Sequence, residues 1–241
     1  NEQQKNASNQ VQTARIMANG DLLYHDGLYM SALQADGSYD FTENFTYVKP
    51  WLKQADLVLG DFEGTINPDY PLSGYPLFNA PQSVTAAIKD AGYDVMDLAH
   101  NHILDSGLEG AFTTADAFKE VGIDPVGVYE NPVRDKAPLF IKNVNGIKVA
   151  ILSYAYGFNG LESNLTEKEI ANHLSNLDEK RMKVEIERAE KEADVTVIMP
   201  QMGVEYRLEP TDEQVKLYHK MIDWGADIIF GGHPHVVEPS E

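Results

Sequence analysis

Two histidines separated by a single proline form the most specific chemical pattern in the sequence. The stretch Gly-Gly-His-Pro-His at 231–235 follows an apolar run at Ile228–Phe230. On so constrained a turn the two imidazoles project to one side, where they can bind one metal ion or two adjacent ions. We therefore expect His233 and His235 to be metal ligands.

Paired carboxylates follow an earlier apolar run. Asp61 and Glu63 lie between two glycines, directly after Leu57–Leu59. Residues two apart on an extended chain point the same way, so both carboxylates can face one cation. Hard oxygen ligands suit Mg²⁺, Mn²⁺ or Ca²⁺, and a carboxylate can bridge two such ions. A solvated turn is the alternative interpretation, which the flanking glycines and the apolar run make weaker.

An asparagine and a histidine follow a third apolar run. Asn101 and His102 come after Val95–Leu98, and Asp105 lies three residues further on. An Asn amide oxygen can bind a metal, while His102 can donate a proton to a departing oxygen. Asp105 can orient His102 through its ring N–H, or it can cap the helix expected to begin near Gly107; both interpretations stay open.

The first apolar run also ends in a carboxylate. Asp21 follows Asn19 and Gly20, just after Arg15–Ala18. Glycine lets the chain turn tightly, so the Asp21 side chain can project beyond the end of the strand. A simple turn is the alternative. Asp21 is a metal-ligand candidate only because the other three apolar runs also end in residues that can bind a metal.

Short apolar runs alternate with amphipathic stretches, which indicates an α/β layered fold with mainly parallel strands. Strands are expected at Arg15–Ala18, Leu57–Gly60, Val95–Ala99, Pro125–Val128, Leu139–Lys142, Lys148–Tyr154, Val195–Pro200 and Ile228–Phe230. Helices are expected at Phe45–Gln54, Pro81–Ala91, Gly107–Glu120, Leu177–Ala193 and Thr211–Trp224. Ligands of open α/β sheets bind beyond the carboxyl ends of the strands, so four strand ends should bring the polar side chains together. A hairpin turn is expected at Asn143–Gly146, and an inserted surface segment or lid at Phe158–Asn176.

Composition narrows the classes of function. Lys and Arg number 19 against 38 Asp and Glu, a formal net charge of −19 over 241 residues. So acidic a surface excludes general nucleic-acid binding and disfavours docking to an anionic membrane surface. The absence of cysteine excludes disulfides, zinc–thiolate sites and thiol nucleophiles. Residues 1–13 are polar and are expected to be a flexible lead-in, either what remains of a removed signal peptide or membrane anchor, or an ordinary terminus.

Taken in order, these motifs resemble the calcineurin-like metallophosphoesterase superfamily, and more closely its capsule branch, the CapA family of poly-γ-glutamate synthesis. The resemblance runs from about Arg15 to the end of the chain. The matching stretches are Gly20-Asp21, Gly60–Ile66, Leu98–His102 with Asp105, Ile198–Tyr206 and Gly232–Val236. The resemblance implies a flexible lead-in followed by one domain over 14–241, an α/β layered metallophosphoesterase-like sandwich of mixed sheets flanked by helices.

The resemblance also implies a divalent metal, Mn²⁺ first, with Mg²⁺, Zn²⁺ or Fe as alternatives. The two implied ligand sets, one for each ion, are Asp21 with His235, and Asn101 with His233. A carboxylate of the second motif, Asp61 or Glu63, would bridge the two ions. Next to them, His102 would be the general acid, supported by Asp105.

Two positions depart from the superfamily pattern. Leu23 stands where a His normally follows the first Asp, a departure that the capsule branch shares. Gln201 occupies the place of a metal-binding His, because the branch normally has His-Trp-Gly where this chain has Gln-Met-Gly. An amide binds a divalent transition ion less well than an imidazole, so we expect one or two ions, with Gln201 at the weaker position. Family members usually continue past the fifth motif, so this chain is either truncated or completed by strands from elsewhere.

The resemblance implies a capsule biosynthesis protein that acts outside the cytoplasm and is anchored to the membrane through a segment absent from this chain. Its substrate would be an anionic polymer or a phosphoester, and its partners capsule synthase or export subunits, with no nucleic acid. As an enzyme it would be a metal-dependent hydrolase or transferase. The alternative is a non-catalytic metal-binding scaffold of a synthesis or export complex. The sequence indicates no oligomeric state.

Overall fold

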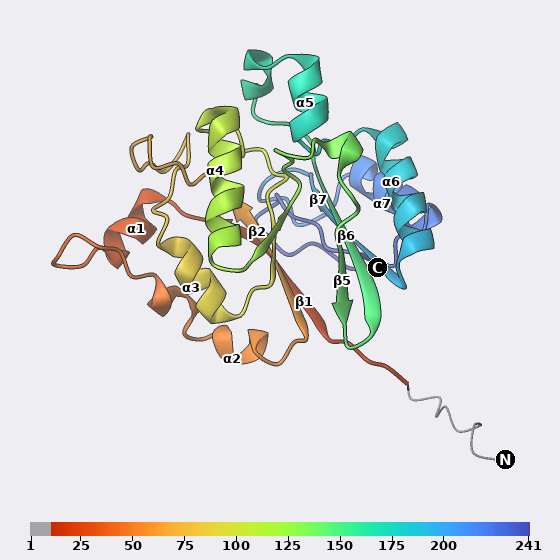
Figure 1. Cartoon of the computed structure of the whole chain (residues 1–241), viewed down its shortest axis with the longest axis horizontal. Coiled ribbons are helices and arrows are strands. Elements are labelled where there is room, and N and C mark those ends of the chain that lie inside the picture. The colour runs from red at the N-terminus through yellow and green to blue at the C-terminus, as the bar shows by residue number, and fades with distance from the viewer. Residues whose placement is uncertain (1–10) are drawn as a thin grey trace.

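Two four-stranded sheets form the centre of the molecule, with helices on both outer faces (Figure 1). The computed structural model describes residues 11–241, so the first ten residues of the expected lead-in lie outside the described residues. The first sheet is parallel throughout, in the order β1 (Ile16–Leu23), β2 (Leu57–Glu63), β3 (Val95–Asp97) and β4 (Asp124–Val126). The second holds β5 (Ile141–Val144), β6 (Ile147–Ala155), β7 (Val195–Gln201) and β8 (Ile228–Ile229), and only its β5–β6 pair is antiparallel. The expected layered α/β fold is confirmed, with one parallel sheet and one mixed sheet.

Helices cover the two sheets separately (Figure 1). The first sheet is covered by α1 (Asp26–Ala32), α2 (Lys49–Leu52), α3 (Val84–Ala91) and α4 (Gly107–Glu120). The second is covered by α6 (Glu179–Glu192) and α7 (Asp212–Asp223), while α5 (Glu167–His173) lies beyond the ends of the strands. Three 3₁₀ turns lie at Thr42–Phe45, Arg134–Lys136 and Leu161–Asn164. Within residues 11–241 no helix is long and apolar enough to cross a membrane.

The central strands are apolar on both faces because each sheet is covered on both faces. Leu59 of β2 lies in the core between the sheets, together with Ile151 of β6. The neighbouring Val58 points the other way and packs with Ile88 of α3. This alternation with a period of two follows from the pleat of a strand, and the burial explains the continuous apolar runs in the sequence.

All eight expected strands are present, with amino ends within two residues of the expectation and carboxyl ends that differ from it by one to five residues. The largest differences lie at the carboxyl ends of β1 and β2, which run on to Leu23 and Glu63. Their polar residues do not end the strands, because Asp21 pairs with Asp61 within the ladder. The sequence pattern therefore identified the correct edge of the sheet, but the predicted strands ended before the functional residues.

The helices were less accurately predicted. The expected helix over 45–54 is wrong in part, because the chain forms a 3₁₀ turn before α2 and Pro50 fits only the first turn of a helix. The helix expected from Pro81 begins three residues later, at Val84. The short helices α1 and α5 were not predicted; α5 lies inside the expected insertion.

Local turn and cap signals were predicted correctly. Thr211 caps α7, where its Oγ1 accepts a hydrogen bond from Gln214 N at 3.1 Å and Gln214 Oε1 accepts one from Thr211 N at 2.7 Å. This reciprocal pair satisfies two backbone donors that the helix leaves open. The β5–β6 hairpin turns through Asn145 and Gly146, at φ 53° and 90°, as a tight two-residue turn requires.

Candidate metal centre

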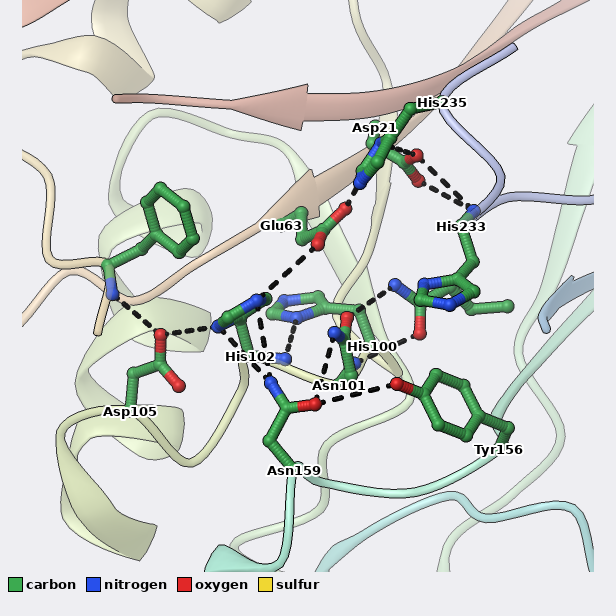
Figure 2. Close-up of polar contacts among 12 residues, drawn as sticks. Asp21, Glu63, His100, Asn101, His102, Asp105, Tyr156, Asn159, His233 and His235 are labelled. Carbon is green, nitrogen blue, oxygen red and sulfur yellow. Dashed lines mark hydrogen bonds and ion pairs between the residues drawn. The ribbon is translucent and has the colours of Figure 1, made fainter. Parts of the chain in front are cut away.

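The structure gathers the sequence-predicted residues at the carboxyl ends of the parallel strands (Figure 2). They are Asp21, Asp61, Glu63, Asn101, His102, Asp105, Gln201, His233 and His235. The first three belong to β1 and β2, and Gln201 ends β7. The remaining five lie on the connections that follow β3 and β8. Residues more than 200 positions apart in the chain thus meet at one edge, as a parallel arrangement requires.

An irregularity in β1 directs Asp21 into this edge. Ala18 pairs with Leu59 but Asp21 pairs with Asp61, so β1 holds one more residue than β2 over this interval. A bulge changes the direction of the side chains that follow it, since one residue of register reverses the face on which each side chain lies. The Asp21 carboxylate therefore points into the site.

Asp21, Glu63 and His235 form the tightest group of metal-binding side chains. Each offers one ligand atom, and these atoms all lie within 4.8 Å of one another. His235 Nδ1 lies 2.8 Å from Asp21 Oδ2 and 4.0 Å from Glu63 Oε2. The two carboxylates are almost fully buried and the imidazole is 16% exposed. We refer to these three residues as the metal triad.

The turn that carries the histidines is held close to the carboxylates. His233 and His235 adopt left-handed backbone conformations, at φ 93° and 56°. His233 N–H donates to Asp21 Oδ1 at 3.1 Å. Gly232 approaches so closely that a Cβ there would lie 2.9 Å from Asp61 Oδ2. Left-handed non-glycine residues are uncommon and persist where the surroundings fix them, often at functional sites.

Burial of the carboxylates makes the site electrostatically costly. Burial, together with the nearby Asp21, raises the pKa of Glu63 to about 8. Burial, with Asp97 and Asp21 alongside, also raises the pKa of Asp61 well above its usual range. Asp21 differs, because hydrogen bonds from His235 and the His233 backbone outweigh burial and lower its pKa.

The residues present fit a divalent cation. In the described part of the chain no Lys or Arg forms an ion pair with Asp21, Asp61 or Glu63. Asp61 Oδ1, Glu63 Oε2 and His233 Nδ1 are buried and have no hydrogen-bond partner. Buried polar atoms are nearly always paired, and buried charges are paired or bind metals. A cation at Asp21, Glu63 and His235 would neutralise the two carboxylates and satisfy Glu63 Oε2.

His102 lies beside the metal triad and is held by Asp105. His102 Nδ1 is 2.7 Å from Asp105 Oδ2, and Nε2 is 3.8 Å from Glu63 Oε1. Asp105 Oδ2 also accepts a hydrogen bond from Phe78 N at 2.6 Å. The residue that precedes α4 is Ser106, so Asp105 orients the imidazole rather than capping the helix. Of the two interpretations that the sequence left open, the structure favours orientation.

Asn101 and Gln201 are joined to each other. Gln201 Nε2 donates to Asn101 Oδ1 at 2.8 Å, and Asn101 N–H donates to Gln201 Oε1 at 2.9 Å. Gln201 is fully buried. The Asn101 oxygen that the resemblance assigns to a second ion is therefore already bonded to an amide. The structure brings these two residues into the site but not into the metal triad.

Four further polar residues lie in this site: Asp97, His100, Tyr156 and Asn159. The sequence pattern did not single out Asp97, Tyr156 or Asn159. Asp97 pairs with Asp61 in the ladder, and burial raises its pKa to about 8. His100 is fully buried, its Nδ1 accepts from His102 N at 3.2 Å, and burial lowers its pKa to about 3, so it is a neutral core histidine. Asp97 directly precedes the third motif and His100 lies within it, and this position is a signal that could have identified Asp97. Tyr156 and Asn159 follow β6 and carry no such signal.

Comparison with known proteins fixes the family. Residues 15–241 match the family described as bacterial capsule synthesis protein PGA_cap. The chain belongs to this family. The PGA_cap chain is 35% identical to the capsule biosynthesis protein CapA of Bacillus anthracis over 203 residues, which cover 80% of this chain and 48% of that protein. It is 31% identical to the PGA biosynthesis protein CapA of Bacillus subtilis strain 168 over 201 residues, 82% of this chain and 52% of that protein.

The PGA_cap chain thus spans about half the length of the curated relatives it matches. A solved structure shares its fold: a Staphylococcus aureus protein named as a 5′-nucleotidase, in complex with alpha-ketoglutarate. The TM-score is 0.58 at 16% identity, over 92% of this chain and 46% of that one. Such a likeness shows the metallophosphoesterase-like fold that the sequence implied, whereas activity depends on the site itself.

Proposed function

We propose that this PGA_cap chain is the metal-dependent, phosphoester-processing part of a capsule biosynthesis protein. The observation that carries the proposal is the contact between two functional units. The metal triad of Asp21, Glu63 and His235 adjoins a His102–Asp105 pair, and Glu63 lies between them (Figure 2). Cleavage of a phosphoester needs a cation that stabilises the negative charge on the phosphoryl oxygens and an acid that protonates the leaving oxygen. A cation-binding group beside an oriented imidazole can supply both.

One divalent ion is the occupancy that the geometry favours. The metal triad supplies two carboxylates and one imidazole, a mixed oxygen and nitrogen set that suits Mn²⁺, with Mg²⁺, Zn²⁺ or Fe as alternatives. Asn101 Oδ1 is bonded to Gln201, which disfavours a second ion there. When bound, the ion would supply a Lewis acid that stabilises charge on the phosphoryl oxygens.

The chain's own residues supply the proton transfer. Asp105 accepts from His102 Nδ1–H and so leaves Nε2 directed toward the Glu63 side of the site. In its protonated form, His102 would donate from Nε2 to the leaving oxygen. Phe78 packs edge-on against the imidazole, at 4.7 Å between ring centroids, and keeps that side of it away from water.

The biological setting is part of the proposal. The names of the relatives, a capsule biosynthesis protein and a PGA biosynthesis protein, support work on an anionic capsule polymer or on a phosphoester that precedes it. Such a polymer is assembled at the cell surface, which supports an extracytoplasmic location, a membrane anchor outside this chain, and synthase or export subunits as partners. A chain of net charge −19 needs a cation where it meets a polyanion, and the metal triad provides the place.

A non-catalytic scaffold is the second candidate. The observation that favours it is the Asn101–Gln201 pair, since the superfamily pattern places metal ligands at both positions. In that case the ion would only stabilise the fold and a docking surface for synthase subunits. The catalytic and the scaffold hypotheses predict the same metal content, so only a measurement of ester hydrolysis distinguishes them.

The test measures metal content and phosphodiester hydrolysis on the same samples after Mn²⁺ loading. We expect one ion per chain and hydrolysis in the wild type, loss of both in His235→Ala, and loss of hydrolysis alone in His102→Ala. His219→Ala is the control, because His219 lies on α7 and contacts only Glu241 at the surface. Metal without hydrolysis in the wild type would select the scaffold. No metal would overturn both candidates.

A further inference from the structure

The connection after β6 places a side chain on the site from outside the five recognised motifs. Asn159 lies next to Gly160, and the two residues adopt left-handed conformations at φ 54° and 80°. The preceding residue, Phe158, fixes this turn, because it is 3% exposed and packs into the core on the outer face of the first sheet. Asn159 itself lies at the surface. Its backbone is thus held in an uncommon conformation that presents the amide to the site.

The Asn159 amide contacts two consecutive residues of the third motif (Figure 2). Its Nδ2 lies 3.4 Å from both ring nitrogens of His102. Its Oδ1 accepts from Asn101 Nδ2 at 3.3 Å and from the Tyr156 hydroxyl at 3.4 Å. One side chain therefore links the imidazole beside the metal triad to the neighbouring asparagine.

The equal distances show how the amide meets the imidazole. His102 Nδ1 is already bonded to Asp105 Oδ2 at 2.7 Å. An amide nitrogen equally far from both ring nitrogens is not aligned with the lone pair of either one, so it lies against the ring. The Phe78 ring meets the same imidazole at an interplanar angle of 90°. Three separate contacts thus restrict rotation of His102, and Asn159 is the one exposed to solvent.

The segment that carries Asn159, residues 156–176, is also fixed at its far end. Leu174 forms a bridge with Val128, and its carbonyl accepts from Arg134 Nη1 at 3.0 Å. The side chain of Arg134 is 1% exposed, so this anchor is buried. A segment held at both ends can keep a side chain in place over the site.

We propose that Asn159 is a positioning residue that holds the His102 ring so that Nε2 faces the leaving oxygen beside the metal triad. The inference rests on the proposed function, since it needs His102 as the proton donor. Without the amide, the ring keeps its bond to Asp105 but gains freedom to swing and contact with water. Proton donation then becomes less efficient while metal binding is unaffected, because Asn159 touches no member of the metal triad.

The first experiment compares two Mn²⁺-loaded phosphodiester reactions that differ in leaving group. Bis(p-nitrophenyl) phosphate releases a stable phenolate and needs little protonation, whereas diphenyl phosphate needs an acid. We expect Asn159→Ala to lower kcat for diphenyl phosphate about tenfold, a part of the roughly 10²–10⁴ that a general acid contributes, because His102 is misplaced rather than removed. We expect a change below about twofold for the nitrophenyl ester, with KM and metal content unchanged. Asn164→Ala, an exposed asparagine of the same segment, is the matched control. Equal losses on both esters would overturn the proposal.

The second experiment needs no turnover, so it separates this inference from the proposed function. Nitrogen-15 NMR of the metal-free protein follows the Nδ1–H signal of His102, assigned by its loss in His102→Ala. The wild type should show that proton protected from water, because the residue is 8% exposed. Asn159→Ala should broaden the signal and Asn164→Ala should leave it sharp. An unchanged signal in Asn159→Ala would overturn the positioning role whether or not the protein hydrolyses any ester.

Discussion

Gln201 and Asn101, 100 positions apart in the sequence, form two hydrogen bonds with each other. The Gln201 amide donates to Asn101 Oδ1 at 2.8 Å and accepts from the Asn101 backbone N–H at 2.9 Å. Both groups are buried, so each satisfies the other where no water enters. The pair has two consequences. It fixes the end of β7 against the connection after β3, and it occupies the oxygen that a second ion would need.

Replacing Gln201 by histidine should open the second metal position. Gln201→His removes the amide that bonds Asn101 Oδ1 and places an imidazole near His233 Nδ1, which is buried and has no partner. Imidazole binds transition ions more tightly than an amide does. We expect the Mn²⁺ content to rise from one toward two ions per chain by elemental analysis.

The control for this substitution is Gln82→His, since Gln82 is exposed and its side chain donates to Glu120 at the surface, away from the site. That variant should keep the wild-type metal content. A Gln201→His protein that folds and still binds a single ion would show that the Asn101–Gln201 pair does not limit occupancy.

Substituting Gly232 should weaken metal binding through the backbone. A Cβ at this position would lie 2.9 Å from Asp61 Oδ2 and 3.0 Å from Asp21 Oδ1, so the turn that carries the histidines must move away. In Gly232→Ala we expect Mn²⁺ affinity to fall about tenfold or more, because a displaced His235 no longer meets the carboxylates. Isothermal titration calorimetry measures the change.

Gly20→Ala is the matched control, because a Cβ at Gly20 would meet nothing within 4 Å although the residue adjoins Asp21. Its affinity should stay within about twofold of the wild type. Equal affinities in the two alanine variants would mean that the close approach at Gly232 is not what sets the geometry of the metal triad.

The metal-free protein should become less stable as the pH rises from about 5 to 8. Burial and the adjacent Asp21 raise the pKa of Glu63 from 4.5 to about 8, so the folded protein keeps a proton that the unfolded chain releases. This contribution to stability is complete below pH 4.5 and is lost as the pH approaches 8. In EDTA, Glu63→Gln should therefore unfold at a higher urea concentration than the wild type at pH 8. At pH 5 the difference should be small.

Two comparisons check the cause. The exposed Glu109→Gln should follow the wild type at both pH values. Mn²⁺ at pH 8 should stabilise the wild type more than Glu63→Gln, since the ion and the lost proton neutralise the same carboxylate. A wild type that gains stability from pH 5 to pH 8 relative to Glu63→Gln would contradict the raised pKa.

The strands and the functional edge could be predicted because they depend on local signals. Leu57–Leu59 and Val197–Met199 are apolar runs flanked by polar residues, Gly or Pro, and a parallel sheet buries such runs on both faces. Asp61 follows the first of these runs and His233 follows Ile228–Phe230, so both side chains fall at one edge by topology alone.

The remaining features depend on long-range contacts. The bulge before Asp21 exists only relative to the register of β2, and the Asn101–Gln201 pair joins the connection after β3 to the end of β7 in the other sheet. Asn159 reaches His102 because Phe158 is buried beneath it, which no spacing along the chain reveals. These contacts become visible only when the strands are assembled.

Replacing Arg134 should lower the stability of the protein, because this side chain connects α6 on the second sheet with the segment of residues 156–176. Arg134 Nε and Nη2 donate to the two oxygens of Glu185 at 3.1 and 2.8 Å, and Nη1 donates to Leu174 O. The Tyr154 hydroxyl donates to the same Glu185 carboxylate at 2.9 Å. Without Arg134, the Glu185 carboxylate keeps its ion pair with Arg181 Nε at 3.1 Å but loses two donors, and Leu174 O loses its own donor, so Arg134→Met should lower the free energy of unfolding by about 2–3 kcal/mol. Urea denaturation measures this loss. Arg188→Met, on the exposed part of α6, should cost less than about 1 kcal/mol, and similar losses in both variants would contradict a buried role for Arg134.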